Sequence, residues 1–254
     1  MRLANQRQIR PYFNLTRGLI GFWPMGGSFP GAEKDCSGRR NDITWGSEPP
    51  YGIGPNGNCR QFNGSSHYGI LPSTFHIPPQ GTVCFQTNLA NLTLGEVIGK
   101  DKANAGNHRI LIGSGFVEFQ VVNGATTKID VAYVLNEYKI KHFVVFWGAG
   151  AGIYVDGILQ AYSASNAYDD SASNVSIGCN MNEGSGRTWY TNSSLMNLFF
   201  YNRVLTAKEV TDLFIYTNNI WQKPTNSAVY LPNYATQRRT ISPLGTRITS
   251  RQGY

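Results

Sequence analysis

Several patterns that would assign the chain to a familiar class of protein are missing from its sequence. No apolar run approaches the roughly 18 residues of a transmembrane helix, and residues 1–13 lack the apolar centre of a secretory signal. The four cysteines form no Cys-x-x-Cys pair and the four histidines are scattered, so the spacing of a zinc site is absent. We therefore expect no membrane segment, no secretory leader and no zinc centre.

The cysteines themselves are few and widely spaced. We expect Cys36, Cys59, Cys84 and Cys179 to be free thiols, buried or half-buried, as is usual for a chain made in a reducing cytosol. A bridge between Cys36 and Cys59 stays open, because spacing alone does not determine pairing.

Charge is also scarce, and the rest of the composition indicates a β protein. Only 15% of the 254 residues are charged, whereas 41% are hydrophobic, so the chain can bury a core. It contains 28 glycines and 14 tyrosines, a composition typical of many short strands joined by tight turns.

Acidic residues are absent from both ends of the chain. Residues 1–17 and 231–254 each hold four arginines and no acid, so the ends supply the net charge of +7. Such ends are either solvated tails or arms that grip a partner. Because they also contain apolar residues, which disordered tails seldom do, we favour arms that dock on protein. The arginines expected to bind the partner are Arg2, Arg7, Arg10, Arg238, Arg239, Arg247 and Arg251.

Between the ends, short apolar stretches alternate with turn residues. This even spacing predicts a jelly-roll β-sandwich, and Asp156-Gly157 is the strongest hairpin signal. Residues 24–58 are expected to form a long loop region. The predicted strands are 18–23, 59–62, 67–71, 82–87, 96–100, 109–112, 117–122, 128–134, 141–147, 152–155, 158–162, 175–179 and 195–201.

One helix is predicted after the last strand. Thr206 and Glu209 fit a capping box, and apolar residues then recur at helical spacing, so we expect a helix over 207–216. We expect it to close the open end of the sandwich. The resulting organisation is an N-terminal arm (1–17), a β-sandwich (18–216) and an extended C-terminal arm (217–254).

Several pieces in a fixed order resemble one superfamily. The pieces are GLIGFWPM (18–25) and the stretches 35–42, 57–64, 142–147, 154–157, 177–178 and 201–210. With them the body is similar to the laminin-G-like, concanavalin A-like (LamG) jelly-roll domains. A basic lead that ends in 15–23, and the stretch Asn219-Ile-Trp-Gln after the helix, resemble the ends of LamG-type proteins encoded by bacteriophages.

The resemblance also sets expectations about chemistry. Glycoside hydrolases of this fold use a Glu-x-Asp-x-x-Glu pattern, which is absent here, as is the Gly-x-Ser-x-Gly of serine hydrolases, so we expect no enzyme. Some LamG relatives bind calcium through an acidic loop. Asp35 and Asp42 are weak candidates for it, but Arg39 and Arg40 between them favour a loop held without metal.

Departures from the family pattern point to a covered surface. Met196, Phe199 and Phe146 occupy positions where relatives carry polar, solvent-facing residues. We expect a neighbouring subunit or an arm to cover this face, the alternative being the C-terminal arm folded back. Arg60 replaces an apolar residue and is expected to bury its stem and expose its head.

Two functions follow from these observations. The first is a structural protein of a phage virion, made in the host cytoplasm: a capsid decoration, cement or fibre-type subunit. It would self-associate and contact the major capsid protein or other virion proteins through its arms. The alternative is a lectin-like module that binds host-surface glycans by stacking sugars on Trp45, Trp189 or Tyr190. Neither function needs a cofactor, a membrane or a specific nucleic acid.

Overall fold

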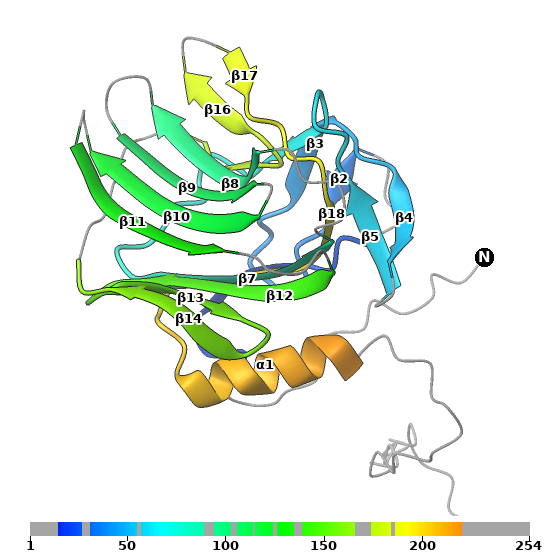
Figure 1. Ribbon diagram of the computed structural model, residues 1–254. Helices are drawn as coiled ribbons and strands as arrows, with labels where there is room; N and C mark the ends of the chain where they lie inside the picture. The colour runs from blue at the N-terminus through cyan, green and yellow to red at the C-terminus, as the bar shows by residue number, and fades with distance from the viewer. Residues whose placement is uncertain are drawn as a thin grey trace, which may run out of the picture. The chain divides into compact units, whose positions relative to one another are not determined.

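The computed structural model confirms an all-β sandwich with one helix among the residues that it describes (Figure 1). The chain divides into two units, Met1–Trp221 and Gln222–Tyr254, and the second lies outside the described part. The described residues are 15–26, 31–54, 57–88, 94–102, 106–113, 115–123, 126–134, 139–165, 174–183 and 186–219.

The first sheet, called sheet A, has eight strands that pair antiparallel. Its central strands β12, β7 and β18 are eight residues each, and β1 (Leu19–Trp23) pairs with β18 beside the main path. In spatial order the main path is β14 (Ile158–Ser163), β13 (Ala151–Val155), β12 (Ile140–Trp147), β7 (Gly81–Asn88), β18 (Ser194–Tyr201), β5 (Gly57–Gln61) and β4 (Tyr51–Gly54).

The second sheet, called sheet B, has ten strands. Its short strands β16 (Asn180–Glu183) and β17 (Gly186–Thr188) lie off the main path, and β16 runs parallel to β8. The main path is β11 (Thr126–Val134), β10 (Phe116–Asn123), β9 (Gly106–Gly113), β8 (Gly95–Lys102), β15 (Ser176–Ile177), β6 (Tyr68–Ile70), β3 (Ile43–Ser47) and β2 (Ala32–Glu33).

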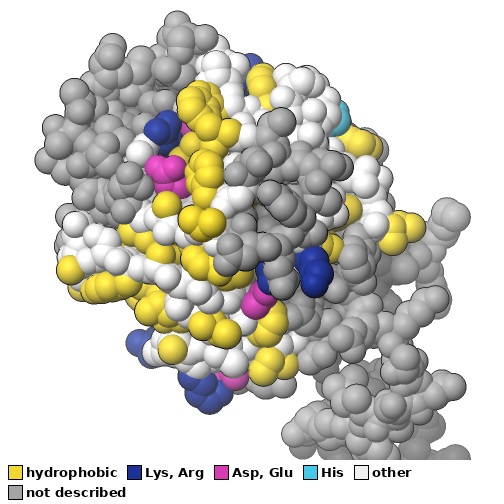
Figure 2. Space-filling model, viewed as in Figure 1, with side chains coloured by type: hydrophobic (Ala, Val, Ile, Leu, Met, Phe, Trp, Pro, Cys, Tyr) yellow, Lys and Arg dark blue, Asp and Glu magenta, His cyan; other side chains and the backbone are white. Residues whose placement is uncertain are grey.

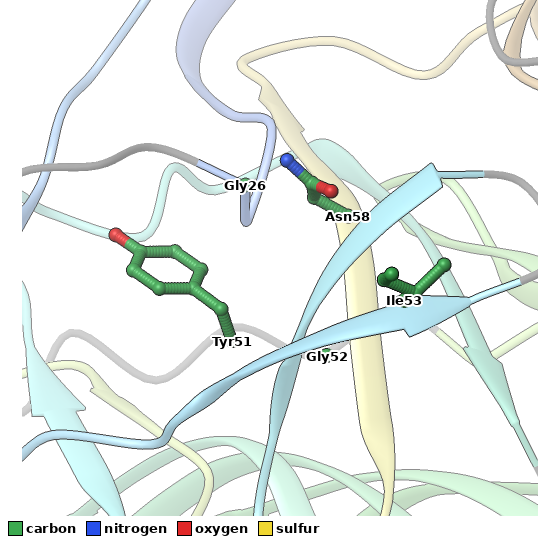
Figure 3. A pocket seen from close by; sticks show the side chains of 5 residues that line it. All are labelled: Gly26, Tyr51, Gly52, Ile53 and Asn58. Carbon is green, nitrogen blue, oxygen red and sulfur yellow. The ribbon is translucent and has the colours of Figure 1, made fainter.

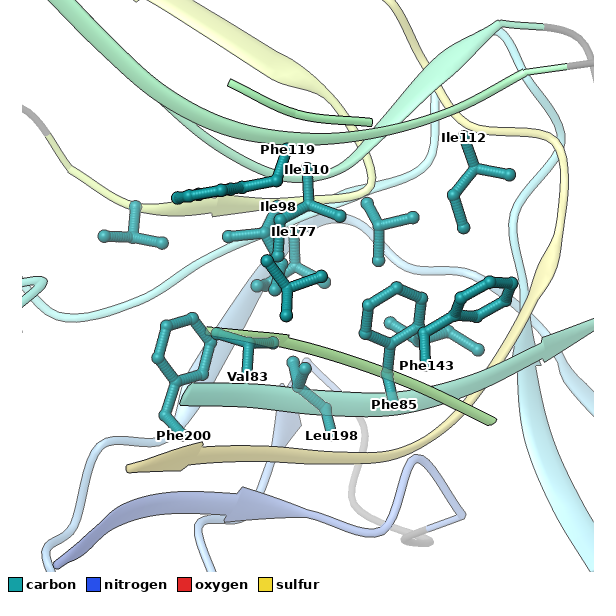
Figure 4. Packing of buried hydrophobic residues seen from close by; sticks show 14 of the residues in the cluster. Val83, Phe85, Ile98, Ile110, Ile112, Phe119, Phe143, Ile177, Leu198 and Phe200 are labelled. Carbon is teal, nitrogen blue, oxygen red and sulfur yellow. The ribbon is translucent and has the colours of Figure 1, made fainter. Parts of the chain in front are cut away.

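The main core lies between the two sheets, where alternate side chains of each strand meet (Figure 4). In β12, for example, Phe143, Val145 and Trp147 point into the core, and Phe143 stacks on Phe85 of β7. Sheet B contributes branched side chains such as Ile110, which face these rings across the sandwich. The alternation of residue types that predicted the strands therefore matches the alternation between buried and outward-facing side chains.

The helix α1 (Ala207–Asn219) covers the outer face of sheet A, where it forms a second apolar cluster (Figure 1). Val210 and Leu213 of the helix belong to this cluster together with Val144 and Phe199 of the sheet. The capping box is present, since the Glu209 amide donates to the Thr206 hydroxyl at 3.2 Å. The helix lies on the outer face of sheet A, so the prediction that it closes an open end of the sandwich is wrong. It packs there because that face is itself apolar.

A β-bulge in β18 explains how this face becomes apolar. The register with β7 gains one residue between Met196 and Phe199, and Asn197 adopts a left-handed φ of 49°. Because of the extra residue, Leu195 and Leu198 both enter the main core, while Phe199 joins the outer cluster.

Two further expectations about the chain before β6 are wrong. Residues 24–58 contain β2, β3, β4 and the start of β5 rather than one long loop. Arg60 of β5 is fully buried, head included, and donates to Glu33 at 3.0 Å and to Glu48 at 2.8 Å. A guanidinium can be buried in this way because two carboxylates offset its charge.

Candidate functional site

The predicted site residues fall into four groups, of which the arm arginines come first. Arg2, Arg7, Arg10, Arg238, Arg239, Arg247 and Arg251 lie outside the described residues. Attachment through the arms therefore stays a prediction.

The predicted outer-face residues do lie outside the main core. Phe199 is buried against Phe22 of β1, with ring centroids 4.3 Å apart, and Met196 is also buried. Phe146 is half-buried and lies in a row of rings with Tyr154 and the exposed Tyr162. The chain's own β1 and α1 supply the cover over Phe199, so its burial requires no neighbouring subunit.

The two weak metal candidates hold their loop through hydrogen bonds. The Asp35 carboxylate accepts from the amides of Phe22, Ser37 and Asn41 at 2.8–3.0 Å. Asp42 accepts from the Asp35 amide and pairs with Lys34 at 2.6 Å. The cation that pairs with this loop is thus Lys34, whereas Arg39 and Arg40 were the expected ones.

Among the three aromatic candidates for sugar stacking, Trp45 is inaccessible. Its ring is 8% exposed, contacts Phe62 edge-on and lies 5.0 Å from the Arg60 guanidinium. Alternation along β3 directs Ile43 and Trp45 inward together. The prediction that Trp45 stacks on a sugar is therefore wrong.

Trp189, by contrast, presents its ring to solvent from the segment that follows β17. It is 44% exposed and has a left-handed φ of 55°. Its backbone is fixed to sheet B, because the Glu96 amide donates to the Trp189 carbonyl at 2.8 Å. The backbone that carries the ring therefore needs no reordering when the ring binds a ligand.

Polar side chains of β9 and β10 accompany this ring on the outer face of sheet B. The guanidinium of Arg109 lies 5.8 Å from the Trp189 ring and donates to Gln120, which stands opposite it in the register. Gln120 in turn donates to Glu118 at 3.1 Å. The half-buried row Arg109–Gln120–Glu118, called the polar row below, offers both donors and acceptors beside the ring.

Tyr190 is half-buried, and close to it a second guanidinium packs on an aromatic ring. Arg187 of β17 lies 4.0 Å from the ring centroid of Tyr68 in β6. The neighbouring charges that act on the Tyr190 hydroxyl include Arg187, which places the two residues close together. Trp189 and Tyr190 thus border two adjacent clusters of polar and aromatic side chains.

Neither arginine of these clusters was among the predicted site residues. Neither lies in a recognisable motif, since each meets a ring from a distant part of the chain. One signal was present: alternation in the strands 109–112 and 117–122 places Arg109 and Gln120 on the face opposite the core.

Other features of the described surface are chemically plainer. A hollow of about 380 Å³ beside the β4–β5 hairpin is lined by Gly26, Tyr51, Gly52, Ile53 and Asn58, with no charged group among them (Figure 3). Hydrophobic and polar side chains are interspersed, and charged ones are few, on the face drawn in Figure 2. Within the described ranges, no helix is long and apolar enough to cross a membrane.

The cysteines are unbridged and unreactive in character. None of the four forms a disulfide, and three of them are buried. Burial is the main cause that raises the pKa of Cys36 to about 11 and that of Cys179 to about 12. Near neutral pH both are therefore thiols, which are poor nucleophiles.

Comparisons with known proteins give similarity at the level of the fold. No protein-family model and no curated protein matches the sequence. The binding domain of Paraclostridial mosquitocidal protein 1 matches with a TM-score of 0.61 and 15% identity, over 79% of this chain and 52% of that structure. The binding domain of botulinum neurotoxin serotype C1 matches with a TM-score of 0.60 and 14% identity, over 80% and 53%.

A third similar structure is the binding domain of botulinum neurotoxin DC in complex with SialylT. Its TM-score is 0.59 and its identity 14%, over 80% of this chain and 52% of that one. The chain thus spans about half the length of each of these structures. The described sandwich is thus similar in fold to the binding domains of these toxins.

Proposed function

We propose that the protein is a non-enzymatic carbohydrate-binding module of the concanavalin A-like type, with its site at Trp189. The observation on which this rests is an exposed indole ring, fixed by its backbone and flanked by the polar row. Sugar rings have one face of C–H groups and a rim of hydroxyls, so they bind to an aromatic ring with donors and acceptors at its edge.

Each part of the site has a distinct role in this proposal. The apolar face of a pyranose stacks on Trp189, which is accessible from solvent. Arg109 donates hydrogen bonds to hydroxyl oxygens, and Glu118 accepts from hydroxyl hydrogens. Gln120 holds these two side chains in place by bonding to both.

The similar structures support this choice of ligand class. One of them is a complex with SialylT, and another belongs to botulinum neurotoxin type C, whose cell entry depends on interaction with two ganglioside molecules. Those ligands belong to the toxins, whose binding domains are about twice as long as the matched region. For the present chain they favour a glycan among the possible ligands.

A glycan array probed with the full chain and a Trp189→Ala variant tests the proposal. We expect binding by the wild-type protein and a loss of about tenfold or more in the variant, as stacking aromatics are worth roughly 1–3 kcal/mol. Tyr162→Ala is the matched control, because it also removes an exposed ring but from the other sheet. Equal binding by wild type and Trp189→Ala would rule out Trp189 as the platform.

A second candidate function is that of a LamG-type structural protein of a phage virion. The observation that favours it is the sequence of the two ends, each with arginines, apolar residues and no acid. Deleting residues 1–15 and 225–254 should leave a folded sandwich that no longer enters particles. Undiminished incorporation of the shortened protein would refute this function.

A further inference from the structure

Arg187 is held in a geometry that keeps its hydrogen-bond donors available. Its guanidinium carbon lies 4.0 Å from the Tyr68 ring centroid, and Arg187 is exposed. The Tyr68 ring rests directly on Gly46, where a Cβ would overlap the ring. The ring is therefore a fixed support, and a guanidinium above it keeps its in-plane N–H groups free at the edges.

No acidic partner occupies those N–H groups in the described part of the chain. The Arg187 side chain forms no ion pair and no hydrogen bond with the described residues, although its backbone pairs with Met181 in the β16–β17 ladder. Arg109, in contrast, donates to Gln120 and lies 3.7 Å from the buried Glu96. Of the two arginines that border the Trp189 segment, only Arg187 thus carries a charge without a compensating group among the described residues.

Tyr190 connects this arginine to the proposed sugar platform. It directly follows Trp189, so the two Cα atoms are about 3.8 Å apart. Burial raises the pKa of Tyr190 above its ordinary value, so the hydroxyl stays protonated at neutral pH and can donate a hydrogen bond. Arg187 and Tyr190 together offer several donors and no acidic acceptor.

We propose that Arg187, Tyr68 and Tyr190 form a subsite, adjacent to Trp189, for the carboxylate or sulfate group of an acidic sugar. The inference rests on the proposed function, since the sugar ring itself would stack on Trp189. A planar guanidinium binds a carboxylate or sulfate through two parallel hydrogen bonds, which suits a single acidic group.

The charge around the subsite argues against a polyanion such as a nucleic acid. Among the described side chains the subsite offers one arginine without an acidic partner, whereas phosphate backbones are bound by several cations. Glu118 also adds a negative charge to the neighbouring polar row. A glycan with one acidic group beside a neutral sugar is the ligand that fits both clusters.

The test uses matched triplets of oligosaccharides on an array: a neutral glycan, its sialylated form and its sulfated form. The full chain should bind both acidic forms about tenfold or more tightly than the neutral parent, because hydrogen bonds to charged groups are strong. Arg187→Gln should remove this preference and leave the neutral glycan unaffected. Arg187→Lys, which keeps the charge but loses the planar fork, should restore only part of it.

Arg39→Gln is the control, because it removes an equal charge from an exposed position in the Asp35–Asp42 loop. It should leave the preference intact, and an equal loss in both variants would reveal general attraction and overturn the subsite. A preference for acidic glycans that survives Arg187→Gln would overturn it as well. If neutral and acidic glycans bind equally well and Trp189→Ala abolishes both, the subsite alone is refuted. If no glycan binds at all, the proposed function is refuted too.

Discussion

Acid should lower the free energy of unfolding of this protein, and about half of that loss should come from one histidine beneath the helix. His142 of β12 is buried between sheet A and α1, and its ring lies 5.7 Å from that of Phe214. Neither ring nitrogen has a hydrogen-bond partner among the residues that the structure describes. Protonation would place a charge in this buried cluster, and Asp156, which accepts from the His142 amide and pairs with Lys141, offsets only part of that cost.

The size of the effect follows from the shifted pKa values of the two buried histidines. Burial lowers the pKa of His142 to about 4 and that of His108 to about 3, below the ordinary 6.5. Between pH 6.5 and 4 the unfolded chain therefore binds more protons than the folded one, so stability present above pH 6.5 is lost as the pH falls. At 1.36 kcal/mol per pH unit, each histidine costs about 2 kcal/mol between pH 6.5 and pH 5.

Urea unfolding at several pH values between 7 and 5 measures this loss. The wild type should lose about 4 kcal/mol from its two buried histidines, and His142→Gln should lose about half of that. The slope with pH is the readout, so a lower stability of the variant at pH 7 does not affect the result. His76→Gln removes an exposed histidine and should keep the full slope. If His142→Gln also keeps it, His142 is not neutral in the folded protein and the reasoning fails.

Two further predictions concern the packing that holds the sandwich together. Arg60→Ala would leave the carboxylates of Glu33 and Glu48 without the guanidinium that bridges them, and should cost about 3–5 kcal/mol in the free energy of unfolding measured with urea. Phe199→Ala would remove the ring that stacks on Phe22 and should cost about 3–5 kcal/mol, visible as a lower Tm. An unchanged midpoint in either variant would contradict the burial described for that residue.

The parts of the fold that could be predicted are those decided by neighbours in sequence. Strand β12 was predicted from its own run of apolar residues, and the capping box of Thr206 and Glu209 lies within four residues. The helix is three residues longer than expected, running to Asn219. Helix ends depend on tertiary contacts, so such differences are common.

The features that could not be predicted depend on partners distant in sequence. β3 and β4 lie among glycines and prolines, and they are strands because β6 and β5 pair with them. Arg60 is buried because Glu33 lies 27 residues away and reaches it across the fold. A local pattern contains neither of these contacts, so exposure of the arginine head was the reasonable expectation.

The same distinction applies to the candidate site. Trp45 and Trp189 both lie in or near predicted loops, which made them equal candidates, yet Trp45 is in a strand with its ring inward. Alternation within ITWGS (43–47) was the available signal. For Trp189 the exposed ring was foreseeable, but the pairings of Arg109 and Arg187 with rings arise only when strands come together.

The apolar outer face of sheet A shows why a covered surface is weak support for a partner. Phe199 departs from the polar pattern of related strands, and its burial by Phe22 and α1 accounts for that departure within the chain itself. What remains for a partner is the row of rings beyond the helix, at Phe146 and the exposed Tyr162. The amphipathic helix predicted after the last strand was a possible cover within the chain, because its apolar face must pack against another apolar surface. An external partner on this face is therefore supported by the exposed Tyr162 and the half-buried Phe146, and no longer by the buried Phe199.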